Sequence, residues 1–453
     1  ENLIITGSIE AKAVSVIVDS GSLTLTDGIS VVAYNDMDLI AQGDINLSSI
    51  QTSDGVITID AKIGRVLDNT NAEISNITVL SDEAVVNIFG ISIGEKDIVD
   101  GENVSDIDLS ISKIGSMIAG SGGIYLDSAR TLDVGDVVTS GDLDVRITSG
   151  DLIFSSDQTV VSASLEVKQG SLRQVSGTTL ETTGVSGSAN SGDLDINVMR
   201  DVTFSTMLVN SGNVTLVSEL GSVLDGTLAD TASLENLVIN NGQLVEMSAT
   251  QIGTHYEGGD INIDALDINS ITASEGGIFI GLTGRDEALT TIDTLTAIAE
   301  QSDVLITSGA GMLQVNNANA SDNLSLRAAG ESGQDSLLVG TARAGGNLAL
   351  SSAVGNITQI ENTDIIANSL GSVTELSSGG DIILVSATND FDELSVDSSK
   401  NLSARDVSNL KVFNINAVGN LSLTTAKQIS LQDDTSITVG GDAVISVSTG
   451  SLI

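Results

Sequence analysis

Residues 192–226 read GDLDINVMRDVTFSTMLVNSGNVTLVSELGSVLDG, and this stretch contains one short unit twice. Each unit opens with Gly, continues with Asp or Asn, and then alternates apolar and polar residues. The two copies open at Gly192 and Gly212, 20 residues apart. Alternation predicts a strand with one buried face, and the opening pair predicts a turn, because Gly reaches positive φ freely and Asp or Asn can bond its own backbone. A recurring strand-and-turn unit predicts a solenoid.

The same pattern, often with the Asp or Asn, continues along the chain. It recurs after Gly43, Gly55, Gly123, Gly141, Gly150, Gly259, Gly277, Gly346, Gly355, Gly380, Gly419 and Gly441. Offsets near nine residues fit one strand with one turn, and offsets near 20 fit one coil with strands on two or three faces. Successive coils would pair in parallel around an aliphatic interior, with Asp142, Asp144 and Arg146 facing water. The residues expected inside are Leu143, Val145, Val214, Leu216, Ile261, Ile263, Leu348, Leu350, Leu421 and Leu423.

The composition supports continuous strand pairing. Hydrophobic residues make up 41% of the 453 residues, which is enough for a continuous core. The chain has no Pro, Cys or Trp and only three Tyr and six Phe. A string of immunoglobulin-like β-sandwiches is the rival fold, but such domains usually carry aromatic core residues and Pro in their loops. The absence of Pro suits unbroken ladders, and the absence of Cys excludes disulfides and thiolate metal sites.

Three stretches are less regular. Residues 69–108 depart from the rhythm, although Gly64-Arg65-Val66-Leu67-Asp68 before them is similar to Gly221-Ser222-Val223-Leu224-Asp225. Residues 178–192, rich in Thr, Ser and Gly, are predicted to form a long turn. Residues 285–300 have apolar residues near helical spacing, yet their many β-branched residues favour a strand.

The charge limits the kinds of partner. Asp plus Glu number 61 and Lys plus Arg number 17, for a formal net charge of −44. Phosphates of a nucleic acid would be repelled, as would an anionic membrane surface. No apolar run approaches the length of about 20 residues that a membrane span needs. We therefore expect no nucleic-acid partner and no membrane span, and a surface that stays soluble in salt and attracts cations.

The runs 140–156 (SGDLDVRITSGDLIFSS), 211–226 (SGNVTLVSELGSVLDG) and 345–360 (GGNLALSSAVGNITQI) resemble the repeats of filamentous haemagglutinin-like exoproteins. These are very large bacterial surface proteins, often two-partner secreted or autotransported. The resemblance covers most of the chain except parts of residues 69–120 and 285–340. It implies a right-handed parallel β-helix, an extracellular or cell-surface location, and adhesive or structural work. Its implied partners are other copies or segments of the same giant protein, or a host cell surface, a neighbouring cell surface or a polysaccharide.

A carbohydrate-active β-helix enzyme, a polysaccharide lyase or hydrolase, is the alternative function. Such enzymes need carboxylates at a set separation, a basic residue and usually aromatic sugar platforms. Here the acidic residues are spread evenly over turns and exposed strand positions, while basic and aromatic residues are sparse. His255 is the only histidine, which excludes a His-rich metal site, and we expect it in an exposed loop. These features favour a protein that is not an enzyme.

Calcium is the one metal that this composition could bind, since the acidic side chains at the turns supply the oxygen ligands that calcium prefers. The spacing of an EF-hand is absent, and so is the nonapeptide of calcium-binding β-rolls. Asp100, Glu102, Asp106 and Asp108 form the densest acidic cluster and are the weak calcium candidate, in what we expect to be a surface loop. No other cofactor is predicted.

The sequence thus predicts an all-β fold, a right-handed parallel β-helix (β-solenoid) that forms a single elongated rod. Residues 1–453 are expected to be one continuous solenoid segment, part of a longer chain. The expected function is that of a structural or adhesive segment of a fibrous protein.

Overall fold

The computed structural model describes residues 1–70, 75–96, 98–99, 102–103, 105–185, 191–227, 235–256, 258–283, 288–330 and 334–450, with the backbone alone for residues 98, 99, 102, 103, 433 and 434. The described residues form strands and turns and no helix, and the strands stack in parallel as a β-solenoid of about 19 turns. The predicted all-β parallel solenoid is therefore confirmed.

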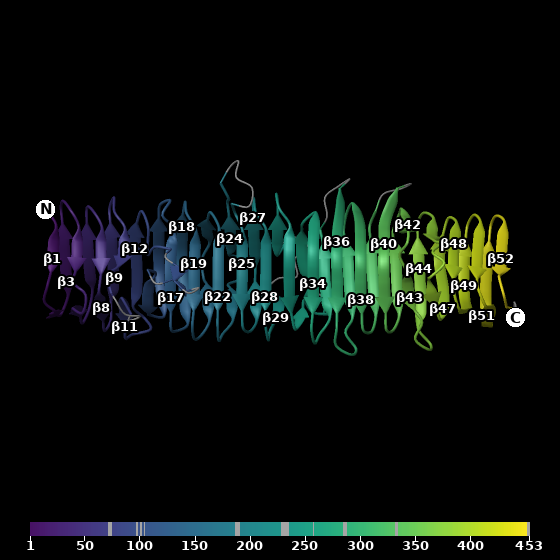
Figure 1. The fold of residues 1–453 in the computed structure, drawn as a ribbon, viewed down its shortest axis with the longest axis horizontal. Helices are drawn as coiled ribbons and strands as arrows, with labels where there is room; N and C mark the ends of the chain where they lie inside the picture. Colours follow the sequence, from purple (N-terminus) through teal and green to yellow (C-terminus); the bar gives the residue numbers. More distant parts are fainter. Residues whose placement is uncertain are drawn as a thin grey trace. The chain divides into compact units, whose positions relative to one another are not determined.

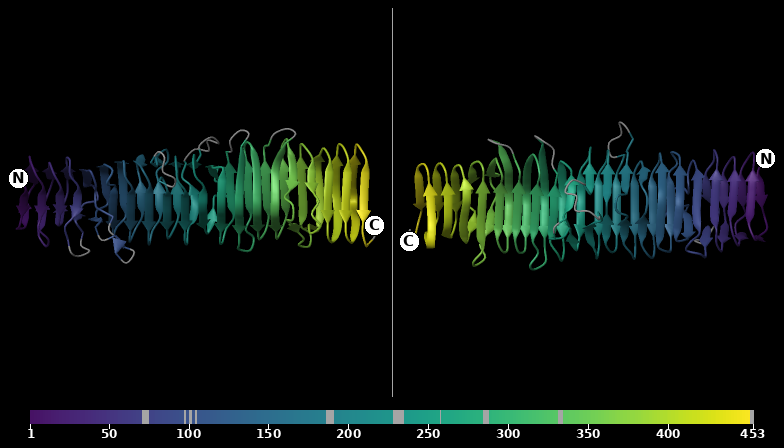
Figure 2. Two further views of the ribbon diagram at one scale, coloured as in Figure 1. Left: turned by 45° about the horizontal axis from the view of Figure 1, so that its top comes forward. Right: turned by 180° about the vertical axis from the view of Figure 1, so that it is seen from behind.

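The chain divides into two compact units. Unit 1 comprises Glu1–Gly221, Gly226–Ala229 and Asn240–Gly242, and unit 2 comprises Ser222–Asp225, Asp230–Ile239 and Gln243–Ile453. In each unit, every coil contributes strands to two sheets, A and B. Within a unit the strands of successive coils lie side by side (Figure 1), and the turns lie at the ends of the strands (Figure 2).

The described strands of unit 1 form two long ladders, one short ladder and one hairpin. Sheet A contains β2 (Ile9–Ala11), β5 (Ser30–Ala33), β8 (Ser49–Thr52), β11 (Ile77–Val79), β15 (Ile107–Ser110), β17 (Ile124–Ser128), β19 (Leu143–Ile147), β22 (Ala163–Val167), β25 (Leu194–Val198) and β28 (Val214–Ser218). The short ladder contains β1 (Leu3–Ile5), β4 (Leu23–Leu25), β7 (Ile45–Leu47) and β10 (Val66–Asp68). Sheet B contains β3 (Val14–Val18), β6 (Met37–Ala41), β9 (Val56–Ala61), β12 (Val85–Gly90), β16 (Lys113–Ala119), β18 (Leu132–Thr139), β20 (Leu152–Phe154), β21 (Gln158–Val160), β23 (Leu172–Gln174), β24 (Thr179–Thr182), β26 (Val202–Phe204) and β27 (Thr206–Val209). The hairpin pairs β13 (Ile98–Val99) with β14 (Glu102–Asn103) in antiparallel fashion.

In unit 2 the strands that the structure describes form two ladders. Sheet A contains β31 (Leu244–Ala249), β34 (Asp267–Ala273), β36 (Leu289–Ala297), β38 (Met312–Ala320), β40 (Asp335–Ala344), β42 (Asn356–Gln359), β43 (Ile365–Ala367), β45 (Ile382–Leu384), β46 (Asp390–Phe391), β48 (Leu402–Asp406), β50 (Leu421–Thr425) and β52 (Ala443–Val447). Sheet B contains β29 (Ser222–Asp225), β30 (Leu237–Ile239), β32 (Gln251–Ile252), β33 (Ile261–Asp264), β35 (Ile278–Leu282), β37 (Val304–Ser308), β39 (Leu324–Ala328), β41 (Leu348–Ser352), β44 (Val373–Ser378), β47 (Glu393–Ser399), β49 (Asn409–Ala417) and β51 (Gln428–Val439).

Some coils bend in the middle of a face. One long strand of a coil then pairs with two short strands of the next coil. In unit 1, β18 pairs with both β20 and β21. In unit 2, β40 pairs with both β42 and β43. These bends create extra corners, and polar side chains gather at them.

The interior is an aliphatic stack between the two sheets of each unit. All ten residues expected inside, among them Leu143, Leu216 and Leu423, are at most 1% exposed. The register explains the 20-residue spacing, because Leu143 pairs with Ala163 one coil on. The next coil is longer, since Ala163 pairs with Leu194, and it takes in the Thr-rich residues 178–192.

Two local predictions have different outcomes. Residues 285–300 were predicted to be a strand rather than a helix, and β36 confirms this for Leu289–Ala297, while residues 285–287 lie outside the described residues. Residues 178–192 were predicted to be a long turn, which is wrong for Thr179–Thr182, because β24 forms there. Leu180 is buried, and the Thr182 hydroxyl donates to the Gly192 carbonyl at 2.7 Å, so this polar run still has an inward face.

Candidate functional site

The repeat unit's Asp or Asn joins one coil to the next in unit 2. The Oδ1 atom of Asn356 accepts a hydrogen bond from the backbone N–H of Asp381 at 2.8 Å, one coil further on. In the same way, the backbone N–H groups of Asn401, Asn420 and Asp442 donate to the Oδ1 atoms of residues one coil earlier. The acceptors are Asp381, Asn401 and Asn420, at 3.1, 2.8 and 2.9 Å. The sequence predicted a turn here but assigned the side chain to its own backbone. That assignment is wrong, because the acceptor bonds the backbone N–H of the next coil.

The same relationship recurs elsewhere. In unit 2, the N–H groups of Asn323, Asn347 and Val373 donate to the preceding Asp303, Asn323 and Asn347 side chains at 3.2, 2.9 and 2.9 Å. In unit 1, those of Ser22, Asp44 and Arg65 donate to Asn2, Ser22 and Asp44 at 2.9, 3.1 and 2.9 Å. We call these series turn ladders. They give N–H groups at the turns partners where the strands have ended.

The glycine before the Asp or Asn is needed for space as well as for conformation. Gly212 has a φ of 141° and agrees with the expected positive φ. Gly380, Gly419 and Gly441 are not among the positive-φ residues, and a Cβ at each would stand 2.4 Å from the Oδ1 atom of Asn356, Asn401 or Asn420. At these turns glycine is required because the ladder oxygen occupies the place of a side chain.

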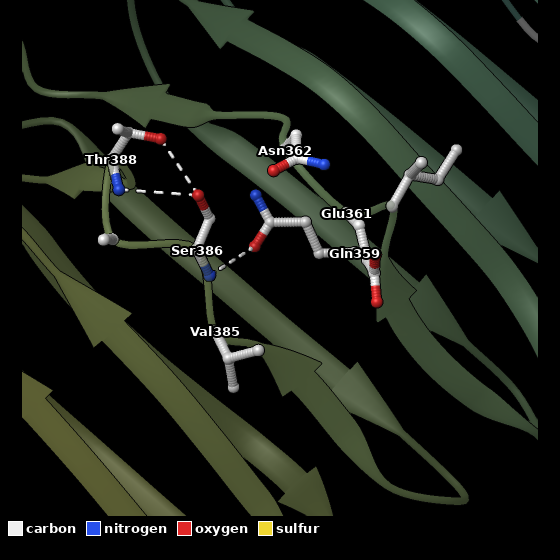
Figure 3. A pocket seen from close by; sticks show the side chains of 8 residues that line it. Gln359, Glu361, Asn362, Val385, Ser386 and Thr388 are labelled. Carbon is white, nitrogen blue, oxygen red and sulfur yellow. Dashed lines mark hydrogen bonds between the residues drawn. The ribbon is translucent and has the colours of Figure 1, made fainter.

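A polar network closes the bend between β42 and β43 in unit 2, and Figure 3 shows two of its members, Gln359 and Ser386. Asn389 is fully buried, and its Oδ1 accepts from the Ile365 N–H at 2.9 Å and from Nε2 of Gln359 at 2.7 Å. Oε1 of Gln359 accepts from Nδ2 of Asn389 at 2.9 Å and from the N–H of Ser386 at 3.2 Å. Ser386 and Thr388 line the outer side of this network, where a surface hollow of about 530 Å³ lies.

A similar bend in unit 1 is built from the same residue types. Gln174 donates through Nε2 to the Thr178 carbonyl at 2.7 Å, as Gln359 does to Thr363 at 3.1 Å. Each Thr hydroxyl bonds back to the second residue of its segment, Val175 or Ile360. Sequence reasoning missed this motif, although residues 174–178 (QVSGT) and 359–363 (QIENT) show it as Gln, a β-branched residue, two turn residues and Thr.

Asp406 holds a further corner of unit 2. Its carboxylate accepts from the N–H groups of Phe391 and Ser408, both at 2.8 Å, and from the Thr425 hydroxyl at 3.3 Å. Burial raises the pKa of Asp406 above its ordinary value, and these donors act in the opposite direction. The carboxylate therefore ties three segments of chain together.

The outward face of sheet A in unit 1 carries a charged row. Arg146 lies between Asp127 and Glu166 in the strand register, with its Nε atom 3.6 and 3.5 Å from their carboxylates. Arg146 and Asp144 were predicted to face water, and both are only partly exposed. Burial raises the pKa of Asp144; nearby Lys96 and Arg146 lower it, and Glu166 and Asp142 raise it further.

The predicted calcium cluster is only partly described. Asp100 and the side chain of Glu102 lie outside the described residues. Asp106 is 5% exposed, and Asp108 lies within β15 with its N–H bonded to Asn76 at 2.8 Å. The expectation of a surface loop is wrong for these two residues, since the chain re-enters the coil there. Among the described residues no group of three or more Asp, Glu, His or Cys is placed to hold a metal, and calcium binding stays a prediction.

His255 lies in an exposed segment, as expected, and its ring packs against that of Phe279 with centroids 5.5 Å apart. The described residues contain no helix long and apolar enough to cross a membrane. In comparisons with known proteins, no family model, no curated protein and no solved structure matches the chain.

Proposed function

We propose that the chain is a structural segment of a very large exported bacterial surface protein of the filamentous haemagglutinin-like kind. The turn ladders carry this proposal. A coil joined to the next by strand pairing along its faces and by side chains at its turns resists separation along the stacking direction. Its work is then mechanical, without catalysis, and its outward faces are available for adhesion to other cells or to polysaccharides.

Two further features support a stacking role. The same contacts recur at several places in each unit, whereas an enzyme's site is usually a single set of converging groups. Nearest-neighbour stacking also makes stability a sum of coil and interface terms, which suits a protein that must be long.

The location is tested with antibodies raised against the whole chain and applied to intact and permeabilised cells of the source organism. Labelling of intact cells is expected. Labelling that requires permeabilisation would contradict export. The mechanical part is tested by pulling a single chain from its two ends. Stepwise loss of groups of coils is expected, while smooth extension at low force would contradict it.

A further inference from the structure

A surface hollow of about 530 Å³ in unit 2 lies between two turns of successive coils. Residues 359–362 line one side of it, and residues 385–388 line the other. Figure 3 shows the side chains of both turns around this hollow. A bend of the same design exists in unit 1, and it shows what the fold itself requires of these residues.

In unit 1 the bend closes with a link of one residue. Ser205 alone lies between β26 and β27. Its N–H donates to Oε1 of Gln174 at 3.1 Å, and Nε2 of Gln174 donates to the Thr206 carbonyl at 2.8 Å. These bonds satisfy the buried Gln174 amide, so a bend of this kind needs no longer link.

In unit 2 the corresponding link is longer. Residues 385–389 lie between β45 and β46, which makes this link four residues longer than the single residue in unit 1. The N–H of Ser386 makes the corresponding bond to Oε1 of Gln359, at 3.2 Å. Oδ1 of Asn389 takes the place of the Thr206 carbonyl and accepts from Nε2 of Gln359 at 2.7 Å.

The extra residues form one wall of the hollow. Val385 is 51% exposed, and Ala387 and Thr388 are exposed as well. The hydroxyls of Ser386 and Thr388 lie 2.9 Å apart, within hydrogen-bonding distance, and the Ser386 N–H is held by Gln359. The wall is therefore fixed in place before any ligand arrives, which favours binding. Because unit 1 closes its bend without such residues, their contribution is to the hollow and not to the coil.

The opposite turn carries a carboxylate and an amide. Glu361 and Asn362 stand where unit 1 has Ser176 and Gly177. Asn362 has a φ of 61° and Gly177 a φ of 84°, so this position needs the left-handed backbone that glycine adopts most easily. Asn362 keeps that conformation and adds an amide. In the part of the chain that the structure describes, neither side chain of the pair Glu361 and Asn362 makes a hydrogen bond or an ion pair.

The lining decides which chemical class of ligand fits. Glu361 repels an anion, and the lining contains no Lys, Arg or His that would offset this. Among the described residues no group of three acidic, His or Cys side chains is placed to hold a metal. Ile360, Val385 and Ala387 add apolar contact beside the polar groups. The fitting ligand is uncharged and combines an N–H donor, an acceptor and a small apolar end.

We propose that this hollow binds a sugar residue that carries an acetamido group, an N-acetylhexosamine unit of a polysaccharide. The acetamido N–H donates to the Glu361 carboxylate, and its carbonyl accepts from Nδ2 of Asn362. Its methyl group packs against Val385, and the hydroxyls of the sugar ring bond to Thr388. This inference rests on the proposed function, in which outward faces adhere to polysaccharides, and it names the class of sugar and the place.

The test measures binding to the full chain by saturation-transfer difference NMR. The probes are methyl N-acetyl-β-glucosaminide and methyl N-acetyl-α-galactosaminide. The matched glycosides without the acetamido group are methyl β-glucoside and methyl α-galactoside, and N-methylacetamide carries the amide without the sugar. At least one acetamido glycoside is expected to bind saturably, and about tenfold more tightly than its matched glycoside, the effect of one or two well-placed hydrogen bonds.

Two variants test the residues. The double variant Glu361→Ser, Asn362→Gly gives unit 2 the pair that unit 1 has, so it is expected to fold and to bind at least about tenfold more weakly. Val385→Ser is expected to reduce the preference for the acetamido glycoside several-fold, because the methyl group loses its apolar contact. The control is the reverse exchange in unit 1, Ser176→Glu, Gly177→Asn. It should add no second site, because unit 1 lacks the longer link.

Three results would overturn the proposal. They are a folded wild-type chain that binds neither acetamido glycoside, binding that the double variant leaves unchanged, and N-methylacetamide that binds as tightly as the glycosides. None of these would bear on surface labelling or on stepwise unfolding. Labelling that requires permeabilisation, with sugar binding intact, would contradict export and leave the site in place, so the two failures are distinguishable.

Discussion

The Oδ1 atom of Asn401 accepts a hydrogen bond from the backbone N–H of Asn420 at 2.8 Å, although 19 residues separate them in the sequence. The same atom explains Gly419, since a Cβ there would stand 2.4 Å from it. The Asn of one repeat unit and the Gly of the next thus form one structural motif that extends across two coils. The polar residue supplies the bond, and the glycine of the next coil leaves room for it.

Gly419→Ala is expected to destabilise the protein by about 1–3 kcal/mol, the usual cost of overpacking. The new methyl group would meet Oδ1 of Asn401 and, at 2.8 Å, the Lys400 carbonyl. Urea unfolding followed by circular dichroism measures the change. Gly7→Ala is the control, because a Cβ there has no atom within 4 Å, and its effect should stay below about 0.5 kcal/mol. Equal effects of the two changes would refute the crowding at this turn.

Asn389→Ala is expected to cost about 2–4 kcal/mol. The Ile365 N–H and the Gln359 amide would each lose a buried partner, at about 1–3 kcal/mol for a group left unsatisfied. The same unfolding measurement applies. Thr388→Ala in the adjoining exposed turn is the matched control and should change stability by less than about 0.5 kcal/mol. A small cost for Asn389→Ala would mean that the bend does not depend on this network.

Much of the fold could be predicted because the signal is local and repeated. Alternation marked Leu143 and Val145 as inward, and both are buried. The contacts at turns and bends could not be predicted in the same way, because they join residues of different coils. The partner of Asn401 depends on coil length, which varies along the chain.

Asp144→Asn is expected to change the pH dependence of stability. Because the pKa of Asp144 is raised in the folded protein, the folded state holds this proton more tightly than the unfolded state does. The resulting stabilisation is fully present below the ordinary aspartate pKa of 3.8 and is lost as pH rises through the raised folded value. Asp144→Asn has no carboxyl group at this position, so its stability does not fall in this way as pH rises.

The variant should therefore become more stable relative to wild type as pH rises from that range towards neutrality. Melting temperatures over a pH series measure the difference. Ser164→Asn, one coil on in the same row, exchanges one uncharged side chain for another, and its difference from wild type should not change with pH. A constant difference for Asp144→Asn as well would show that burial of this carboxylate does not affect folding.

Salt is expected to stabilise the protein because the net charge of −44 is held on closely stacked coils. Asn relieves this repulsion within the turn ladders, since Nδ2 of Asn401 donates to the Asp381 carboxylate at 2.8 Å. Asn401→Asp replaces that donor with a second carboxylate. Two charges about 4 Å apart repel by about 1 kcal/mol in water and by more near a protein surface. The variant should therefore lose at least that much stability in dilute buffer.

Sodium chloride at about 0.5 M should reduce this loss by screening, and calcium at a few mM should reduce it further by bridging the two carboxylates. Melting temperatures of wild type and Asn401→Asp in NaCl, CaCl₂ and EDTA test this. The wild type should gain gradually with salt, because its repulsion is spread over many turns. Midpoints that do not change with salt would refute the electrostatic argument. Collapse of the wild type in EDTA at high NaCl would instead mean that specific calcium sites exist, and Asp106 and Asp108 would then be the first residues to replace.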